Sequence, residues 1–365
     1  MKLLFLTKRF GSGIDSILED FGRQVRLTEN LVKLGHEVHL VAADYVKKQT
    51  FEKTLNGAKV SVIPFSFFSF SHYIAKLRKK IQREKYDAII TSSDPVFGAI
   101  ALMVGRNIPI IYDVQDNYFT YASYRIPLVR MLEKKVLKKA VFVTAVSNPL
   151  VHRMKRYSKN VILIGNGMDP NKIKPIDKFV SRKKYKLPMK SKVITYSARY
   201  KDKDQKKPID FLIRSFNLIK KKHKNICLLL IGEGNVSRLK KERDNERIIA
   251  FESVKYDVLV EMLSSTDILT IPAVQSPYSE YAAPYKLIEY MAFSKPIVCS
   301  DVGEMKNLLS RTSQLIFKQN NTDDFARKIE LALKIKKVDY SKQLKRLTWS
   351  AITKKLHKEI IKELK

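Results

Sequence analysis

A short segment in the second half of the chain, residues 284–289, combines a helix start with one basic and one acidic side chain. Pro284 marks the start of a helix, whose free backbone N–H groups would hold a diphosphate, with Lys286 adding a point charge. Glu289 follows about one turn later, where its carboxylate can accept hydrogen bonds from two vicinal hydroxyls, such as those of a ribose. These residues predict a nucleotide site, and the alternative is that Glu289 is a surface helix residue.

The charge around this segment differs from that of the rest of the chain. The 365 residues include 70 Lys and Arg against 36 Asp and Glu, and both halves share the formal net charge of +34. Such a charge implies an anionic partner or a solvated, self-repelling surface. Residues 251–300 are the exception, because acidic residues outnumber basic ones there. A pocket for ribose and sugar hydroxyls needs acidic groups, which would explain why residues 251–300 are acidic.

Alternating strand and helix patterns indicate the framework that must position these residues. In the first half, apolar runs predict strands at residues 3–7, 37–42, 60–64, 88–91, 109–113 and 141–146, with a helix at 17–34 that ends at Gly35. The same rhythm restarts with strands at 192–197, 226–232, 248–251, 268–272 and 296–301 and a helix at 209–222. Strands that alternate with helices form parallel sheets, which bind ligands at the carboxyl ends of their strands.

These patterns predict an α/β protein with two Rossmann-like, doubly wound domains that face a cleft, and with a C-terminal helix. We place the first domain at residues 1–175 and the second at 176–345. The charged tail at 346–365 is expected to be a helix that could cross back to the first domain. A stretch with Lys and Pro but little periodicity, residues 172–190, is interpreted as the linker between the domains.

Several kinds of segment and site are not expected. No apolar run approaches the twenty residues of a membrane span, and the start of the chain leads directly into a strand rather than a signal peptide. We therefore expect a soluble, cytoplasmic protein. Cys227 and Cys299 lie in apolar runs and are interpreted as small buried side chains. The histidines show no pair at metal-ligand spacing, so no metal site is expected.

Two polar motifs follow strands of the first half. Gly11-Ser12-Gly13 is similar to the start of a dinucleotide fingerprint, but position 16 is Ser where a third glycine is needed, which disfavours an NAD enzyme. Asp113 and Asp116 follow the end of a predicted strand. They either form a capping or turn pair or take part in catalysis.

A set of motifs occurs in order along the chain. The longest is residues 283–292, Ala-Pro-Tyr-Lys-Leu-Ile-Glu-Tyr-Met-Ala, followed by Lys-Pro-Ile-Val at 295–298. The shorter ones are Gly11-Ser12-Gly13, Gly35-His36-Glu37-Val38, Asp113-Val114-Gln115-Asp116, Ser147, Asn166-Gly167-Met168-Asp169, Ser197-Ala198-Arg199 with Lys207, and Gly232-Glu233-Gly234. Over about residues 1–310 this ordered set resembles the retaining glycosyltransferases of the GT-B fold, the family-4-like group also called glycosyl transferases group 1.

The resemblance implies a donor-side second domain, an acceptor-side first domain, and sugar transfer from a nucleotide diphosphate sugar to a cell-surface glycan or lipid-linked acceptor with retention of configuration. It implies no metal, and no cofactor besides the donor substrate, because basic side chains would neutralise the leaving diphosphate. The implied donor-binding residues are Gly11, Gly13, Arg199, Lys207, Pro284, Tyr285, Lys286, Leu287 and Glu289. The implied catalytic residues are Gln115, Asp116 and Glu280.

The sequence departs from the family pattern at three of these positions. Glu280 lies one residue earlier than the family spacing requires, so the sugar-reading role falls to Glu280 or to a neighbour. Gln115 stands where histidine is common, and its amide can still hydrogen-bond a sugar. The loop before Lys207 is longer than usual and offers other lysines for the phosphates, namely Lys201, Lys203 and Lys206.

Residues 65–85 combine aromatic side chains with a basic amphipathic helix. Ile74, Leu77 and Ile81 form one apolar face of this helix, and basic residues crowd the remainder. This pattern is typical of a segment that binds a membrane surface. We therefore expect peripheral binding to the anionic inner face of the cell membrane through Lys76, Lys79, Lys80 and Arg83. The alternative is a crossover helix that packs on the sheet.

Two functions from other classes remain open. A nucleic-acid-binding protein would explain the charge, but the sequence has no recognised nucleic-acid module and its basic residues do not form one stripe, so no nucleic acid is expected as a partner. A non-catalytic nucleotide-sugar-binding protein of the same fold would retain Arg199 and Glu289 without transferring a sugar.

Overall fold

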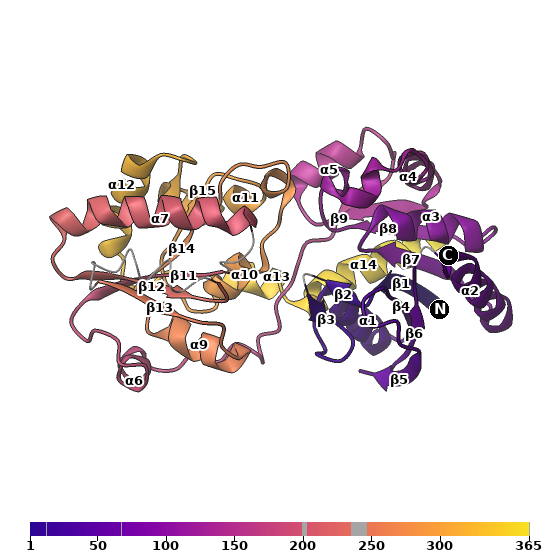
Figure 1. Ribbon diagram of the computed structural model, residues 1–365, viewed down its shortest axis with the longest axis horizontal. Helices are drawn as coiled ribbons and strands as arrows, with labels where there is room; N and C mark the ends of the chain where they lie inside the picture. Colours follow the sequence, from indigo (N-terminus) through magenta and orange to yellow (C-terminus); the bar gives the residue numbers. More distant parts are fainter. Residues whose placement is uncertain (12, 67, 199–202, 235–246, 365) are drawn as a thin grey trace. The chain divides into compact units, whose positions relative to one another are not determined.

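The computed structural model describes residues 1–11, 13–66, 68–198, 203–234 and 247–364, with only the backbone for 203–206. The chain folds into two compact α/β units (Figure 1). The first comprises Met1–Gly167, Tyr281–Ala283 and Trp349–Lys365, and the second comprises Met168–Glu280 and Pro284–Thr348. The sequence prediction divided the chain after residues 175 and 345.

The first unit is built on an eight-stranded sheet in the order β10-β9-β8-β7-β1-β4-β6-β5, in which only β5 and β6 pair antiparallel. The strands are β1 (Lys2–Lys8), β4 (Glu37–Asp44), β5 (Phe51–Leu55), β6 (Ala58–Pro64), β7 (Ala88–Ser92), β8 (Ile110–Val114), β9 (Phe142–Ala145) and β10 (Val161–Leu163). Parallel strands covered on both faces are almost continuously apolar, which is why their runs predicted them. The prediction missed β5, which has no buried residue, and β10, which has only three residues.

Helices cover both faces of this sheet (Figure 1). They are α1 (Arg23–Lys33), α2 (Phe70–Glu84), α3 (Pro95–Val104), α4 (Pro127–Lys139), α5 (Asn148–Met154) and α14 (Trp349–Leu364). Helix α3 packs between α2 and α4, and α14 packs against α1. The helix predicted from residue 17 is too long, because α1 begins only at Arg23. Gly22 precedes it with φ 98°, a conformation that interrupts a helix.

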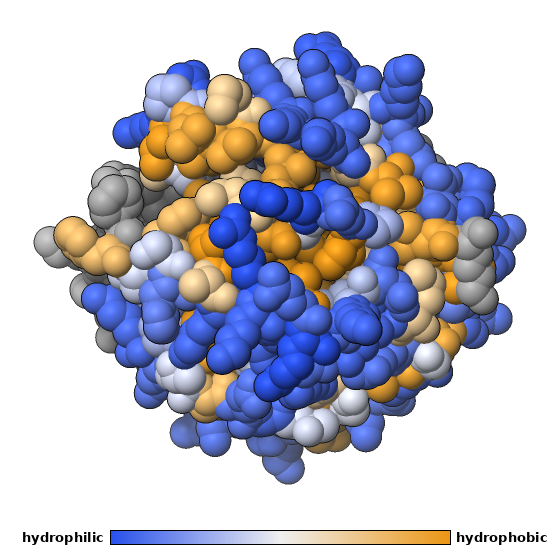
Figure 2. Space-filling view, turned by 90° about the vertical axis from the view of Figure 1, so that its right-hand side faces the viewer, coloured by the Kyte–Doolittle hydropathy of each residue, from blue (hydrophilic) through white to orange (hydrophobic). Residues whose placement is uncertain are grey.

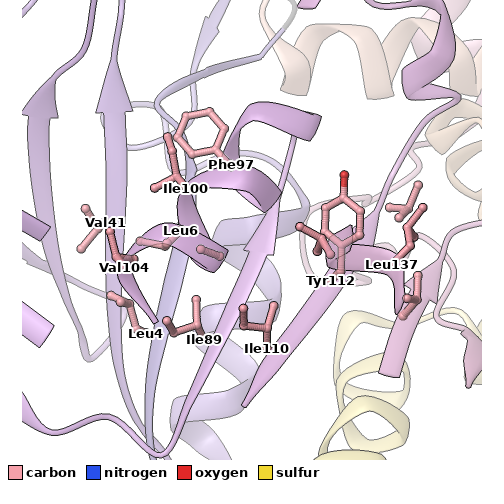
Figure 3. Close-up of a cluster of buried hydrophobic side chains, with 14 of the residues drawn as sticks. Leu4, Leu6, Val41, Ile89, Phe97, Ile100, Val104, Ile110, Tyr112 and Leu137 are labelled. Carbon is pink, nitrogen blue, oxygen red and sulfur yellow. The ribbon is translucent and has the colours of Figure 1, made fainter. Parts of the chain in front are cut away.

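Apolar side chains of β1, β7 and β8 meet those of α3 and α4 in the core of the first unit (Figure 3). Leu6 and Ile89 lie on the strands, while Phe97, Ile100 and Leu137 lie on the helices, and all five are buried. Full burial of each such side chain contributes about 1.5–3 kcal/mol. This core fixes the carboxyl ends of the strands, where the polar motifs of the first half lie.

The second unit is built on a parallel sheet in the order β13-β12-β11-β14-β15-β16. The strands are β11 (Lys192–Ser197), β12 (Ile226–Ile231), β13 (Ile248–Phe251), β14 (Ile268–Ile271), β15 (Ile297–Ser300) and β16 (Ile316–Phe317). The order of strands reverses between β11 and β14. In doubly wound sheets such a reversal is where ligands bind, beyond the carboxyl ends of the two strands.

The helices of the second unit include one in the predicted linker. They are α6 (Lys178–Lys184), α7 (Lys203–Lys222), α9 (Tyr256–Ser264), α10 (Tyr285–Met291), α11 (Met305–Leu308), α12 (Thr322–Leu333) and α13 (Ser341–Arg346). The Asp177 side chain caps α6, and buried Arg182 binds Asp267 at 2.6 Å. The linker interpretation of residues 172–190 was therefore wrong for α6, which packs as an ordinary element of this unit.

The helix predicted at 346–365 corresponds to α14, which belongs to the first unit, while α13 just before it belongs to the second. In the described part of the chain, no helix combines the length and the hydrophobicity needed to cross a membrane.

Candidate functional site

Lys286 of α10 reaches the carboxyl end of β11. Its Nζ donates a hydrogen bond of 2.8 Å to the carbonyl oxygen of Ser197 and lies 4.6 Å from the centre of the Tyr196 ring. Burial of the ammonium lowers the pKa of Lys286 to about 8. An anion bound beside Nζ would replace lost solvation, so this lysine is poised to bind a phosphate.

Glu289 lies one turn after Lys286 on the same helix. Its Oε1 accepts a hydrogen bond of 2.9 Å from the hydroxyl of Tyr256, which belongs to α9. Burial raises the pKa of Glu289, while Tyr256 and the charge of Lys286 act in the opposite direction. The carboxylate therefore keeps acceptor capacity for hydroxyl groups of a ligand beside the cation.

Two further contacts fix the end of β11 against its neighbours. The hydroxyl of Tyr290 accepts a hydrogen bond of 3.0 Å from the Ser197 backbone N–H and lies 3.0 Å from the Ser197 Oγ. Gly232, just after β12, has φ 148°, and a Cβ atom at this position would lie 1.7 Å from the carbonyl oxygen of Ala198. Only glycine allows this close approach, which explains the first glycine of the Gly232-Glu233-Gly234 motif.

The other predicted donor-binding residues of the second unit differ in burial and in their place on the helices. Leu287 is fully buried in the core, so its side chain does not face a ligand. Pro284 occupies the N-cap position, one residue before the helix rather than in its first turn, and Tyr285 is the first residue of α10. Lys207 is exposed on α7. Arg199 lies outside the described residues, as do the side chains of Lys201, Lys203 and Lys206.

Helix α10 has only seven residues, so an anion at this point would depend more on Lys286 than on the helix dipole. Glu280 is exposed in the short helix η3 (Ser279–Tyr281), and its backbone N–H donates to the carbonyl oxygen of Ser276 at 3.1 Å.

Two residues that follow Glu280 belong to the first unit. There the carbonyl oxygen of Tyr281 accepts a hydrogen bond from Ser147 Oγ, and the carbonyl oxygen of Ala283 accepts one from Asn166 Nδ2.

Asp113 at the end of β8 forms a buried ion pair. Arg23 donates to it at 2.8 Å, Ser92 Oγ donates at 2.8 Å, and Thr144 Oγ1 donates at 2.5 Å. Burial opposes ionisation of Asp113, but Arg23 and the hydroxyl donors hold its pKa below the usual value. Since Arg23 also donates to the carbonyl oxygen of Ile164 at 2.7 Å, this pair joins α1, β8 and the segment after β10. Asp113 is therefore a structural residue.

Gln115 and Asp116 follow β8 and are partly buried. The Gln115 Nε2 donates to Ser92 Oγ, and its Oε1 accepts from Gln24 Nε2 at 3.1 Å. Asp116 Oδ2 accepts from the hydroxyl of Tyr121 at 2.7 Å. Both side chains are thus oriented by neighbours of the first unit, at the carboxyl edge of its sheet.

Gly11 and Gly13 belong to a small hairpin after β1, formed by β2 (Phe10–Gly11) and β3 (Ile14–Asp15). Gly13 has φ 79°, and Ser12 lies outside the described residues. The fully buried guanidinium of Arg9 fixes the hairpin, because it binds Asp15 at 2.6 Å and Asp44 at 2.8 Å. The sequence reasoning missed this anchor.

Helix α2, which the sequence assigned to a membrane surface, packs on the sheet. Its apolar residues Tyr73, Ile74, Leu77 and Ile81 are buried in the core, as in the alternative interpretation. Lys76 and Lys79 are exposed, Lys80 pairs with Glu52 at 3.0 Å, and Arg83 pairs with Glu84 at 2.9 Å. Only the basic face of this helix therefore remains exposed.

Sequence comparison finds two family models that together cover most of the chain. Residues 24–172 match the model described as Glycosyltransferase Family 4, and residues 191–334 match the model described as Glycosyl transferases group 1. The chain is also similar to the capsular polysaccharide biosynthesis glycosyltransferase CapM of Staphylococcus aureus. The two are 23% identical over 322 residues, which are 83% of this chain and 82% of CapM.

Structural comparison gives the same fold. A sucrose-phosphate synthase of Thermosynechococcus elongatus superposes with a TM-score of 0.76 at 14% identity, over 99% of this chain and 98% of that one. HepE of Anabaena, solved in complex with UDP, gives a TM-score of 0.75 at 15% identity, over 99% of this chain and 100% of that one. With both family models matched in order and the GT-B fold shared, the chain belongs to the group 1 glycosyltransferases.

Proposed function

We propose that this chain transfers a sugar from a nucleotide diphosphate sugar to a lipid-linked acceptor or a cell-surface glycan, with retention of configuration and without a metal ion. Membership of the group 1 glycosyltransferases supports the reaction class. The observation that carries the proposal is that Lys286 reaches the end of β11 and that Glu289 follows it one turn later on the same helix. A cation and a carboxylate at this distance suit a diphosphate and a ribose of one ligand.

In the proposed mechanism, Lys286 acts on the leaving diphosphate. Its ammonium is partly desolvated, so its attraction for phosphate charge is stronger than that of a lysine in water. Arg199 and Lys207 are proposed to share this charge, which removes the need for a divalent cation. Glu289 is proposed to accept hydrogen bonds from the ribose hydroxyls. Transfer that continues at full rate in excess EDTA would support metal independence, and loss of transfer would contradict it.

Retention of configuration is proposed from the family resemblance. The acceptor would attack on the face that the diphosphate leaves, through an ion-pair-like transition state, so no carboxylate is assigned as a covalent nucleophile. Gln115, Asp116 and Glu280 are proposed to contact the sugar. The anomeric configuration of the product, measured by NMR before it equilibrates, tests this point, and an inverted product would overturn it.

The names of the relatives suggest a donor and an acceptor class to try first. HepE has been solved with UDP-glucose, and CapM is described as a glycosyltransferase of capsular polysaccharide biosynthesis. We therefore propose a UDP-sugar donor, a membrane-bound acceptor of polysaccharide or glycolipid synthesis, and peripheral association with the inner face of the cell membrane.

The donor site is tested by replacing Glu289 with glutamine. Loss of hydrogen bonds to a charged group costs about 1.5–3 kcal/mol, so the affinity for UDP should fall about tenfold to a hundredfold. Glu330→Gln on α12 is the matched control, because it changes a carboxylate elsewhere in the same unit. Affinities are measured by calorimetry, and an unchanged affinity of Glu289→Gln would overturn the site assignment.

Turnover assays separate the enzyme from the other two classes. Donor binding without hydrolysis, or without transfer to any acceptor, would identify a non-catalytic nucleotide-sugar-binding protein. Salt-sensitive binding to arbitrary DNA, without turnover of any nucleotide sugar, would identify a nucleic-acid-binding protein.

A further inference from the structure

The exposed side chains of η2 (Ala122–Arg125), Ile126 and α4 (Pro127–Lys139) combine large apolar groups with cations. Ile126, Leu128 and Met131 are 52%, 58% and 60% exposed. The cations of the same stretch are also exposed and are Arg125, Arg130, Lys134, Lys135, Lys138 and Lys139. We call these nine side chains the α4 surface. Its apolar groups lie at the start of the helix, and most of its cations follow toward the end.

Acidic groups are missing from the exposed side of this helix. The one carboxylate of α4 is Glu133, which is buried and accepts a hydrogen bond of 3.0 Å from the hydroxyl of Tyr112. Within the described residues, no ion pair involves any of the six cations of the α4 surface. A dense group of cations without acidic partners attracts an anionic surface rather than balancing charge within the protein.

A hollow of about 420 Å³ adjoins this surface. It is lined by Phe119, Tyr124, Pro127, Arg130, Met131, Lys134 and Tyr157. The two cations of this lining can hold an anionic headgroup, while the rings and Met131 offer apolar contact for a hydrocarbon chain. Figure 2, which looks onto the end of the first unit at the right of Figure 1, shows apolar areas bordered by hydrophilic side chains.

Helix α2 itself lacks this combination, although Phe68, two residues before its start, is 96% exposed. Its apolar face is buried in the core, and two of its cations, Lys80 and Arg83, pair with glutamates. Helix α6 does expose Phe179 and Val180, but the cations at its two ends pair with Asp267 and Glu261. The α4 surface differs from both in extent, because three exposed apolar groups accompany six exposed cations that form no ion pair within the described residues.

We propose that the α4 surface, and not α2, docks this chain onto an anionic lipid bilayer. This inference rests on the membrane association given under the proposed function and assigns its residues. Ile126, Leu128 and Met131 would enter the boundary between headgroups and acyl chains, and the cations would contact the headgroup phosphates. The contact would hold the first unit, proposed to bind the acceptor, at the surface where a lipid-linked acceptor is found.

The charge part of the proposal is tested with two variants that each remove three cations from the full chain. One is Arg130→Gln/Lys134→Gln/Lys135→Gln on α4, and the control is Lys76→Gln/Lys79→Gln/Arg83→Gln on α2. Co-sedimentation uses phosphatidylcholine vesicles with or without phosphatidylglycerol, at low and physiological salt. Each α4 cation should raise the affinity for anionic vesicles about fivefold. The α4 variant, which lacks three of them, should therefore bind these vesicles about a hundredfold more weakly. The α2 variant should bind almost as well as the unaltered chain.

The apolar part is tested with Leu128→Asn/Met131→Asn, and Phe179→Asn/Val180→Asn on α6 is the control. All four side chains are largely exposed, so thermal unfolding should be unchanged in both variants. Weaker vesicle binding by the α4 variant alone would support the proposal. The proposal would be overturned if the α4 and α2 charge variants lost vesicle binding equally. It would also be overturned if Phe179→Asn/Val180→Asn on α6 lost more vesicle binding than Leu128→Asn/Met131→Asn.

Two outcomes separate this inference from the proposed enzyme. If the unaltered chain binds no anionic vesicles, the α4 proposal and the membrane association both fail, although transfer to an acceptor in detergent would still support the transferase. If vesicle binding depends on the α4 surface but no sugar is transferred, the docking surface stands and the proposed reaction fails.

Discussion

Lys286 is partly buried, and within the described residues no carboxylate forms an ion pair with it. Its Nζ contacts a backbone carbonyl oxygen and an aromatic ring instead. Such surroundings make the ammonium easier to deprotonate than that of a lysine in water, and a bound phosphate would stabilise the ammonium. The protonation of this one side chain should therefore be coupled to donor binding.

This coupling predicts that the affinity for UDP falls as the pH rises through about 8. Because burial lowers the pKa of Lys286 to about 8 in the free protein, the ammonium is present below that pH and is lost above it. One unit above the pKa only about a tenth of the lysine is charged, so UDP should bind about tenfold more weakly near pH ~9 than near pH ~7. Isothermal titration across this range measures the effect.

The control is Lys286→Met, which cannot be protonated. It should bind UDP weakly at every pH in the range, with a flat profile. A variant that retains the pH dependence of the unaltered chain would show that another group titrates.

The buried pair of Arg23 and Asp113 predicts a large loss of stability in Asp113→Asn. Removal of the carboxylate leaves a buried guanidinium without its ion partner, which costs about 3–5 kcal/mol. The folded-state pKa of Asp113 is lowered, so its contribution is present above the pKa of the unfolded chain and is lost as the pH falls through the folded value. Urea unfolding measures the change, with exposed Asp257→Asn as the control. A change below about 1 kcal/mol for Asp113→Asn would contradict this account.

The sequence indicates site residues where one motif contains them, and misses them where the fold assembles them. Lys286 and Glu289 share a helix, so their spacing alone predicts that they lie about one turn apart on it. Arg23 meets Asp113 across a separation of 90 residues, and Tyr256 meets Glu289 across 33. No local pattern contains such pairs, so only the arrangement of strands reveals them.

At the scale of elements, the strands of both sheets were the most predictable features. The bounds of β11 and β13 agree with the prediction, because each is an apolar run of parallel-sheet type. β16, a two-residue strand, was too short to show a pattern. The predicted start of α1 was wrong, because residues 17–21 continue the apolar helical period in the sequence. The backbone conformation of Gly22 nevertheless prevents the helix from extending back to them.

The close packing of β11 and β12 predicts that Gly232→Ala disrupts the end of β11. A methyl group would meet the Ala198 carbonyl oxygen at 1.7 Å, and the backbone at φ 148° strains any L-residue besides. The variant should unfold at a lower urea concentration, by several kcal/mol, and bind UDP more weakly because Ser197 moves. Gly165→Ala is the control, because its added carbon has no neighbour closer than 3.8 Å. Equal stability of the two variants would contradict this role of Gly232.

At the scale of the whole molecule, the first unit is assembled from separate parts of the chain. Residues 1–167 form its sheet. Helix α14 follows the second unit in the sequence and packs back onto the first. Helix α14 buries Trp349, Ile352, Leu356 and Ile360. The sequence indicated a charged tail helix, but its buried apolar residues are spread among lysines and glutamates, so its packing partner could not be read locally.

This connectivity predicts that residues 1–167 alone form an unstable unit that a peptide of residues 349–364 stabilises. Without α14, the fragment exposes the surface of α1 that the helix covers, and loses the hydrogen bond of 2.8 Å between His36 and His357. Since the buried side chains of α14 each contribute about 1.5–3 kcal/mol, an excess of the peptide should raise the melting temperature of the fragment by several degrees. A peptide carrying Leu356→Asp should have no effect, because it would bury an unpaired charge in the same groove. Equal melting temperatures with and without the unaltered peptide would show that the first unit folds without its last helix.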